Sequence, residues 1–144
     1  MTVRRISVVV PAHNEFPLVQ GCLDALHVAA ARVRVPVRIV VVADACSDRT
    51  AALAHAHGAE VIEVAERNVG RARGAGMAYA LRDGPDGLWL ATTDADSRVP
   101  ANWFRRHLRH ANRGADLIAG TGRRTSPVRL RGPPHRARRR SCRW

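Results

Sequence analysis

The sequence contains no lysine, so all 24 of its basic residues are arginines. This pattern indicates a bias toward GC-rich codons, which weakens any functional interpretation of the arginine content. Residues 1–120 carry 15 arginines against all twelve acidic residues, whereas residues 121–144 carry nine arginines and no acid. The net charge of +12 therefore belongs mainly to the last 24 residues and says little about the rest of the chain.

Long apolar runs and paired cysteines are missing as well. No run of about 18 uncharged apolar residues is present, so the sequence predicts no membrane-spanning helix. The apolar run after Arg4 and Arg5 stops after five residues at a polar loop, which favours a strand over a secretory signal. Cys22, Cys46 and Cys142 show no metal-site or disulfide spacing. These absences predict a cytoplasmic protein of about one domain.

Short apolar runs rich in β-branched residues alternate with stretches of helical character. The runs do not alternate in polarity, as expected of strands covered on both faces. They lie at 6–10, 37–43, 60–64 and 88–92, with a further candidate strand at 116–119, and the expected helices lie at 16–33, 49–57, 70–82 and 101–112. This order predicts an α/β fold over residues 1–120: a Rossmann-like, mostly parallel sheet flanked by helices.

The expected helices have apolar faces. Leu18, Cys22, Leu23, Leu26 and Ala30 recur at helical spacing in the first helix. In the last helix, apolar residues also gather on one side, and we expect its two aromatic residues, Trp103 and Phe104, to anchor it in the core.

Four polar loops follow the four expected strands: "PAHNE", "DACSDRT", "ERNVGRARGAG" and "TTDADSRVP". Ligands of open α/β sheets bind beyond the carboxyl ends of the strands, so we expect these loops to converge on one site. The fourth loop places Asp94 and Asp96 one residue apart, where two like charges would repel each other. A Mg²⁺ or Mn²⁺ ion relieves this repulsion, since it takes hard oxygen ligands. The alternative is a solvated turn in which an aspartate caps the next helix.

The four loops together resemble the inverting family-2 glycosyltransferases with the GT-A fold, which use nucleotide-diphosphate sugars. The segments that carry the resemblance are "ISVVVPAHNE", "IVVVADACSDRT", "NVGRARGAGM" and "TDADSRVPANW", within about residues 5–120. The resemblance implies that Asp94 and Asp96 bind a divalent metal, Mn²⁺ or Mg²⁺, which holds the donor's diphosphate. It also implies that Asp44 hydrogen-bonds the nucleotide base, although Ala43 replaces an aspartate that the family usually has.

Other positions take roles from the same resemblance. It implies that Pro11, Ala12, Asn14 and Glu15 line the nucleoside pocket and that the loop from Asn68 to Arg73 closes over the nucleotide. Arg71 and Arg73 have the chemistry to meet phosphate oxygens, and Gly70, Gly74 and Gly76 permit close backbone approach.

Structural alternatives stay open at several of these positions. Asp44 could cap a helix near Ser47, Asn14 and Glu15 could form a turn that begins a helix, and the two arginines could be a solvated helix face. Asp48 is interpreted as a structural helix-start residue, and His13 as a surface or packing residue.

Several other functions are disfavoured. The glycines do not follow the G-x-G-x-x-G order of dinucleotide sites, and "PAHNE" lacks the glycines and lysine of a phosphate-binding loop. Cys46 has no recognisable partner for a thiol nucleophile. A nucleic-acid binder that uses the basic tail is a weak alternative, since the tail has no recognisable reading motif. A nucleotide-sugar-binding module without turnover is the stronger alternative.

The last part of the chain, residues 121–144, combines arginine, proline and glycine without periodic apolar residues, and we expect no packed structure there. No acidic residue follows Asp116, so the catalytic base that the resemblance implies has no candidate, and the acceptor-binding part is missing. Activity is therefore uncertain. The abrupt change near residue 121 is consistent with a natural truncation or with out-of-frame translation.

Overall fold

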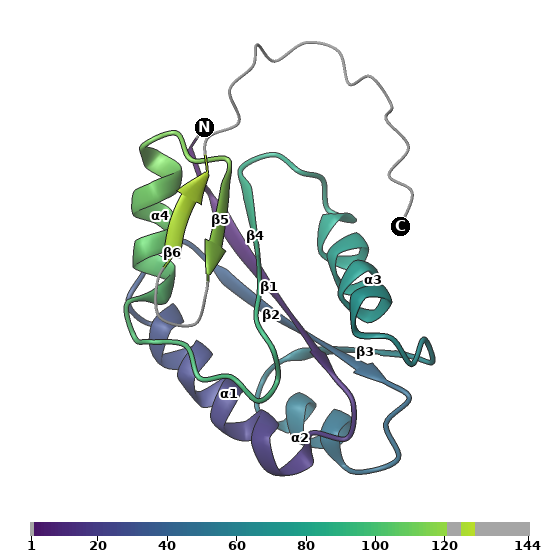
Figure 1. Cartoon of the computed structure of the whole chain (residues 1–144). Helices are drawn as coiled ribbons and strands as arrows, with labels where there is room; N and C mark the ends of the chain where they lie inside the picture. The colour runs from purple at the N-terminus through teal and green to yellow at the C-terminus, as the bar shows by residue number, and fades with distance from the viewer. Residues whose placement is uncertain (1, 121–124, 129–144) are drawn as a thin grey trace, which may run out of the picture.

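The computed structural model describes residues 2–120 and 125–128 of the chain. Its centre is a sheet of four parallel strands in the order β3-β2-β1-β4 (Figure 1). The strands are β1 (Arg5–Ala12), β2 (Val37–Asp44), β3 (Glu60–Val64) and β4 (Leu88–Thr92). The strand and helix order confirms the predicted α/β class, with most boundaries displaced by one to three residues.

Helices cover both faces of the sheet (Figure 1). Helices α1 (Phe16–Ala30), α2 (Thr50–Ala56) and α4 (Trp103–Asn112) contribute to the larger hydrophobic cluster, and α3 (Val69–Leu81) packs on the opposite face. Residues of β1 alternate between the two clusters, since Val8 and Val10 belong to the first and Val9 to the second. The two central strands are almost wholly buried, which explains their continuous apolar runs.

Two details of the predicted helices and strands need correction. Leu18 was expected on the buried face of α1, but its side chain is 51% exposed and Val19 is buried instead. Strand β3 was expected to be covered on both faces, but it lies at an edge of the sheet and is only half-buried. Phe104 is fully buried, which confirms it as a core residue, whereas Trp103 is partly buried and packs against the same cluster.

A second, two-stranded sheet follows α4. Strand β5 (Leu117–Gly120) pairs antiparallel with β6 (Thr125–Val128) and is not hydrogen-bonded to the parallel sheet. The expected fifth strand therefore exists, but outside the main sheet. The tail is expected to lack packed structure, and within it residues 125–128 form strand β6, whose backbone pairs with β5. The rest of the tail lies outside the described residues.

Within residues 2–120 and 125–128, no helix is long and apolar enough to cross a membrane.

Candidate functional site

A cavity of about 790 Å³ opens at the carboxyl ends of the parallel strands, and all four predicted loops contribute to its wall. We call it the polar cavity. Most of the predicted site residues line it: Pro11, Ala12, Asn14, Glu15, Asp44, Asn68, Arg73, Asp94 and Asp96. Arg71 and the three glycines Gly70, Gly74 and Gly76 do not. The expected convergence of the loops is therefore present in the structure.

Asn14 and Asp48 tie the first loop to the second. Asn14 adopts a left-handed backbone conformation (φ 51°), and its Oδ1 accepts hydrogen bonds from the backbone N–H groups of Ser47 (2.8 Å) and Asp48 (3.3 Å). The Asp48 carboxylate accepts from the backbone N–H groups of Phe16 (3.2 Å) and Thr50 (2.9 Å), the first residues of α1 and α2. Asp48 is thus structural, as predicted, and the amide oxygen of Asn14 has a structural role besides lining the cavity.

Asp44 organises the third loop. Its side chain is 3% exposed, and its two oxygens accept the backbone N–H groups of Arg67 (2.8 Å) and Asn68 (3.0 Å). Burial raises the pKa of this carboxyl group, but the backbone hydrogen bonds outweigh that effect and hold the pKa below its usual value. The suggested cap near Ser47 is not formed by Asp44, because its carboxylate binds the loop before α3.

His13 and Cys46 make contacts around the same strand ends. His13 Nδ1 lies 2.6 Å from the backbone carbonyl oxygen of Asp44. A carbonyl oxygen can only accept, so Nδ1 carries a proton, and Nε2 is the acceptor when the ring is neutral. Cys46 Sγ lies 3.5 Å from the carbonyl oxygen of Ala12 and accepts the backbone N–H of Asn14 at 3.4 Å. These contacts give both side chains a packing role.

The amino end of α3 faces the polar cavity. Asn68 caps this helix, since its Oδ1 accepts the backbone N–H of Arg71 at 2.9 Å. The Arg71 side chain is 74% exposed, forms an ion pair with Glu66 (3.3 Å) and does not line the cavity. Gly76 does not face the cavity either, because it packs against the sheet.

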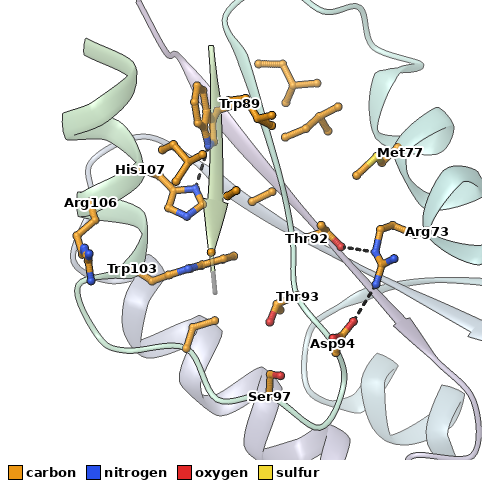
Figure 2. A pocket seen from close by; sticks show the side chains of 18 of the residues that line it. Arg73, Met77, Trp89, Thr92, Thr93, Asp94, Ser97, Trp103, Arg106 and His107 are labelled. Atoms are coloured by element: carbon orange, nitrogen blue, oxygen red, sulfur yellow. Dashed lines mark hydrogen bonds and ion pairs between the residues drawn. The ribbon is translucent and has the colours of Figure 1, made fainter. Parts of the chain in front are cut away.

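Asp94 and Asp96 both line the polar cavity, but their partners differ. Asp94 Oδ1 accepts a hydrogen bond from Arg73 Nη2 at 2.8 Å, and Arg73 Nε donates to the Thr92 hydroxyl at 3.1 Å (Figure 2). Asp96 accepts from the adjacent Ser97 hydroxyl at 3.5 Å. Neither carboxylate caps α4, which begins after Asn102.

The negative charges of Asp94 and Asp96 affect the pKa of Cys22 in α1. The Cys22 thiol lies 3.5 Å from the backbone carbonyl oxygen of Asp94. Burial, followed by the charges of Asp96 and Asp94, raises the pKa of this thiol to about 11. Cys22 is therefore protonated at neutral pH and can donate to that carbonyl oxygen.

The donor set of the polar cavity fits a hard divalent cation. Four carboxylates line the cavity against two arginines, Arg67 and Arg73, so an anionic ligand would be repelled without an added positive charge. Among the residues that the structure describes, no group of three or more His, Cys, Asp or Glu side chains could form a full protein cage for a metal. Two neighbouring carboxylates nevertheless suffice for Mg²⁺ or Mn²⁺ when ligand oxygens fill the other positions.

A second hollow, of about 1150 Å³, runs along β4, and we call it the β4 groove (Figure 2). Arg73 and Asp94 line both this groove and the polar cavity. Trp89 Nε1 donates to His107 Nδ1 at 3.0 Å in its wall, and Trp103 packs on the His107 ring. Burial, with smaller contributions from His110 and Arg106, lowers the pKa of His107 to about 4. The sequence did not predict this groove. Its wall is formed by residues from α3, β4, α4 and β5, and no local sequence pattern indicates that these elements lie side by side.

Comparison with known proteins identifies the class. The model of the family "Glycosyl transferase family 2" matches residues 7–143, which is most of the chain and includes most of the tail. The chain belongs to this family, as the four loops predicted. No curated protein is significantly similar to it.

Solved structures with a similar fold include two of TarS 1-349 from S. aureus. The complex with UDP has 18% sequence identity and a TM-score of 0.64, and covers 86% of this chain and 38% of that one. The complex with UDP-GlcNAc has the same identity and a TM-score of 0.63, and covers 86% and 37%. The mannosyltransferase PcManGT from Pyrobaculum calidifontis, in complex with GDP-Man and Mn²⁺, has 29% identity and a TM-score of 0.50, and covers 71% and 30%. The chain thus spans less than two fifths of the length of each neighbour.

Proposed function

We propose that residues 1–120 form the donor-binding part of an inverting glycosyltransferase, with the nucleoside diphosphate of a nucleotide sugar in the polar cavity. The observation that carries this proposal is the convergence of Asp94 and Asp96 with the loops after β1, β2 and β3 on one cavity. Its volume, about 790 Å³, is in the usual range for small-molecule sites, roughly 300–1,000 Å³. The complexes of TarS with UDP and of PcManGT with GDP-Man support this ligand class.

The residues of the cavity divide the proposed task between them. Asp94 and Asp96 would hold a Mn²⁺ or Mg²⁺ ion, and the Mn²⁺ in the PcManGT complex supports that choice. When bound, the ion supplies positive charge that stabilises the leaving diphosphate. The amino end of α3, at Asn68 and Val69, offers a dipole that favours anionic oxygens, and Arg73 adds a cationic side chain.

The proposed roles of the residues near the nucleotide base follow from their contacts. Pro11, Ala12, Asn14 and Glu15 would border the nucleoside, as the resemblance implies. Asp44 has both oxygens hydrogen-bonded to the third loop, so a contact with the base would be added to an already occupied carboxylate. We therefore propose that the main role of Asp44 is to shape the cavity by holding the third loop.

Transfer with inversion also needs a base that deprotonates the acceptor hydroxyl. Glu15, Asp44, Asp94 and Asp96 are the acidic residues of the polar cavity, and each has a donor-binding assignment. We propose that the chain binds the donor, and that the acceptor site and the base are not contained in residues 1–120. A binding module without turnover is the second candidate function, favoured by the lack of an unassigned carboxylate in the described wall of the cavity.

Calorimetry with UDP and GDP, with and without Mn²⁺, tests the proposal. We expect Mn²⁺ to tighten binding of at least one nucleotide, and Asp94→Asn or Asp96→Asn to weaken that Mn²⁺-dependent binding at least about tenfold, because each removes a charged ligand. Asp86→Asn is the matched control, since it makes the same charge change before β4, at the other end of the strand. Nucleotide binding that does not depend on Mn²⁺, or Mn²⁺-dependent binding that is unchanged in both aspartate variants, contradicts the metal assignment.

A transfer assay with the corresponding nucleotide sugars then separates the two candidates. Sugar transfer to an acceptor would establish an enzyme, whereas tight donor binding without transfer would establish the binding module.

A further inference from the structure

The contact between Arg73 and Asp94 is the one side-chain ion pair that links α3 to the aspartate pair in the described part of the chain. Arg73 Nη2 lies 2.8 Å from Asp94 Oδ1. The Arg73 side chain is 30% exposed and that of Asp94 is 61% exposed, so the pair borders solvent and an ion can reach it. One of the two carboxylates assigned to the cation therefore already has a positively charged partner.

Arg73 is held in this position from its other side. Thr92 Oγ1 lies 3.0 Å from the backbone carbonyl oxygen of Val9, which can only accept, so the hydroxyl proton points to that carbonyl. The lone pairs of the hydroxyl oxygen then remain for Arg73 Nε at 3.1 Å. Two donors of one rigid guanidinium are thus fixed, which limits its freedom to leave Asp94 (Figure 2).

We propose that Arg73 is an internal competitor of the divalent cation for Asp94, so that binding of the cation requires release of the guanidinium or an energetic penalty for keeping it. This inference rests on the proposed function, because it assumes that Asp94 is a ligand of the cation. If the cation took the same carboxylate oxygen, it would displace Arg73. If it took the other oxygen, a double positive charge would lie within a few ångströms of the guanidinium and be repelled.

The competition makes the cation and the diphosphate bind cooperatively. Without a nucleotide, Asp94 is neutralised by Arg73 and attracts a cation weakly. A diphosphate brings negative oxygens with which a released guanidinium can pair, so each ligand should improve the binding of the other. Arg73 thereby acts as a positioning residue that keeps cation affinity low until the donor's diphosphate is bound.

The test measures Mn²⁺ binding alone, without nucleotide, from the electron paramagnetic resonance signal of free Mn²⁺. Arg73→Gln should tighten Mn²⁺ binding roughly 3- to 10-fold, because an exposed ion pair and a like-charge repulsion are removed together. Thr92→Val, which keeps the β-branched shape and the charge but removes the hydroxyl that positions Arg73, should shift the affinity in the same direction by less. Arg82→Gln is the matched control: it removes an arginine just past the opposite end of α3, where it pairs with Glu60 and Asp83, and should leave Mn²⁺ affinity unchanged.

The outcomes separate this inference from the proposed function. Unchanged or weaker Mn²⁺ binding by folded Arg73→Gln, while Asp94→Asn abolishes binding, would overturn the competition and leave the metal site intact. The competition is equally overturned if Arg73→Gln does not fold and Thr92→Val binds Mn²⁺ like the unsubstituted chain. If the unsubstituted chain binds no Mn²⁺ even with UDP or GDP, both the inference and the metal assignment fail.

Discussion

Two glycines two residues apart on α3 should respond to the same substitution with opposite signs. A Cβ added at Gly74 meets no atom within 4 Å, whereas one added at Gly76 would overlap the side chains of Val9 and Val42. Alanine at an interior helix position is favoured over glycine by about 1 kcal/mol, so Gly74→Ala should stabilise the fold by about that amount. Overpacking costs roughly 1–3 kcal/mol, and both valines are fully buried, so the clash should exceed the propensity gain at Gly76.

The expected net effect of Gly76→Ala is a destabilisation of up to about 2 kcal/mol, which places the two variants about 1–3 kcal/mol apart. Urea unfolding at constant temperature measures this difference directly. In a thermal melt, each kcal/mol should move the Tm by about 3–5 °C for a chain of this size. Nucleotide affinity is the second readout, because neither glycine lines the polar cavity and Gly74→Ala should leave the affinity for UDP or GDP unchanged.

Equal stabilisation by both substitutions would refute the packing argument, since it would mean that α3 can move away from β1 and β2 without cost. A loss of nucleotide affinity in Gly74→Ala would instead support the sequence-based expectation that this glycine allows close backbone approach to the ligand.

Two further predictions concern pH and the buried polar groups. The folded state lowers the pKa of His107 to about 4, so stability should be fully present above the unfolded value of about 6.5 and fall by up to about 3 kcal/mol as the pH drops to 4. Urea midpoints across that range check this, and His107→Gln, which keeps an acceptor for Trp89, should flatten the profile. Asp44→Asn should destabilise the fold and speed amide exchange at Arg67 and Asn68, because an amide has only one oxygen to accept their N–H groups. Since the Asp44 pKa is lowered, the stability difference should disappear as the pH falls through that pKa. If Asp44→Asn changed nucleotide affinity and left stability untouched, Asp44 would act on the base alone.

The central part of the fold was readable in the sequence because local composition and burial agree there. The run at 37–43 predicts a strand, and the buried strand β2 forms at Val37–Asp44. The buried face of α1 was harder, because Leu18 and Val19 both fit an apolar stripe and only the position of the helix on the sheet selects Val19. For β5, residues 116–119 suggested a strand, but the choice of β6 as its partner depends on residues whose composition gives no strand signal.

The sequence predicts which loops form the candidate site, but it does not predict which side chains contact each other there. Parallel strands bring their carboxyl ends to one edge, which is why Asp44 and Asp94 line one cavity although 50 positions separate them in the sequence. Which donor each carboxylate binds is decided by tertiary packing. The sequence offered Arg71 and Arg73 as equal candidates for phosphate, but the structure turns the first toward Glu66 and the second toward Asp94.

The backbone of the loops around the polar cavity is held by hydrogen bonds within the protein. The loops after β1, β2 and β3 each contain one non-glycine residue in the left-handed region: Asn14, Ala45 and Arg67. This conformation costs roughly 1–2 kcal/mol for a residue such as alanine or arginine, so other contacts must hold it. The Ala45 N–H donates to the Val64 carbonyl at 2.7 Å and the Arg67 N–H to Asp44, which fixes both turns from strands of the sheet. Because these turns are fixed by the protein itself, little ordering of the rim should oppose donor binding, and affinity should depend mainly on the charges at Arg73, Asp94 and Asp96.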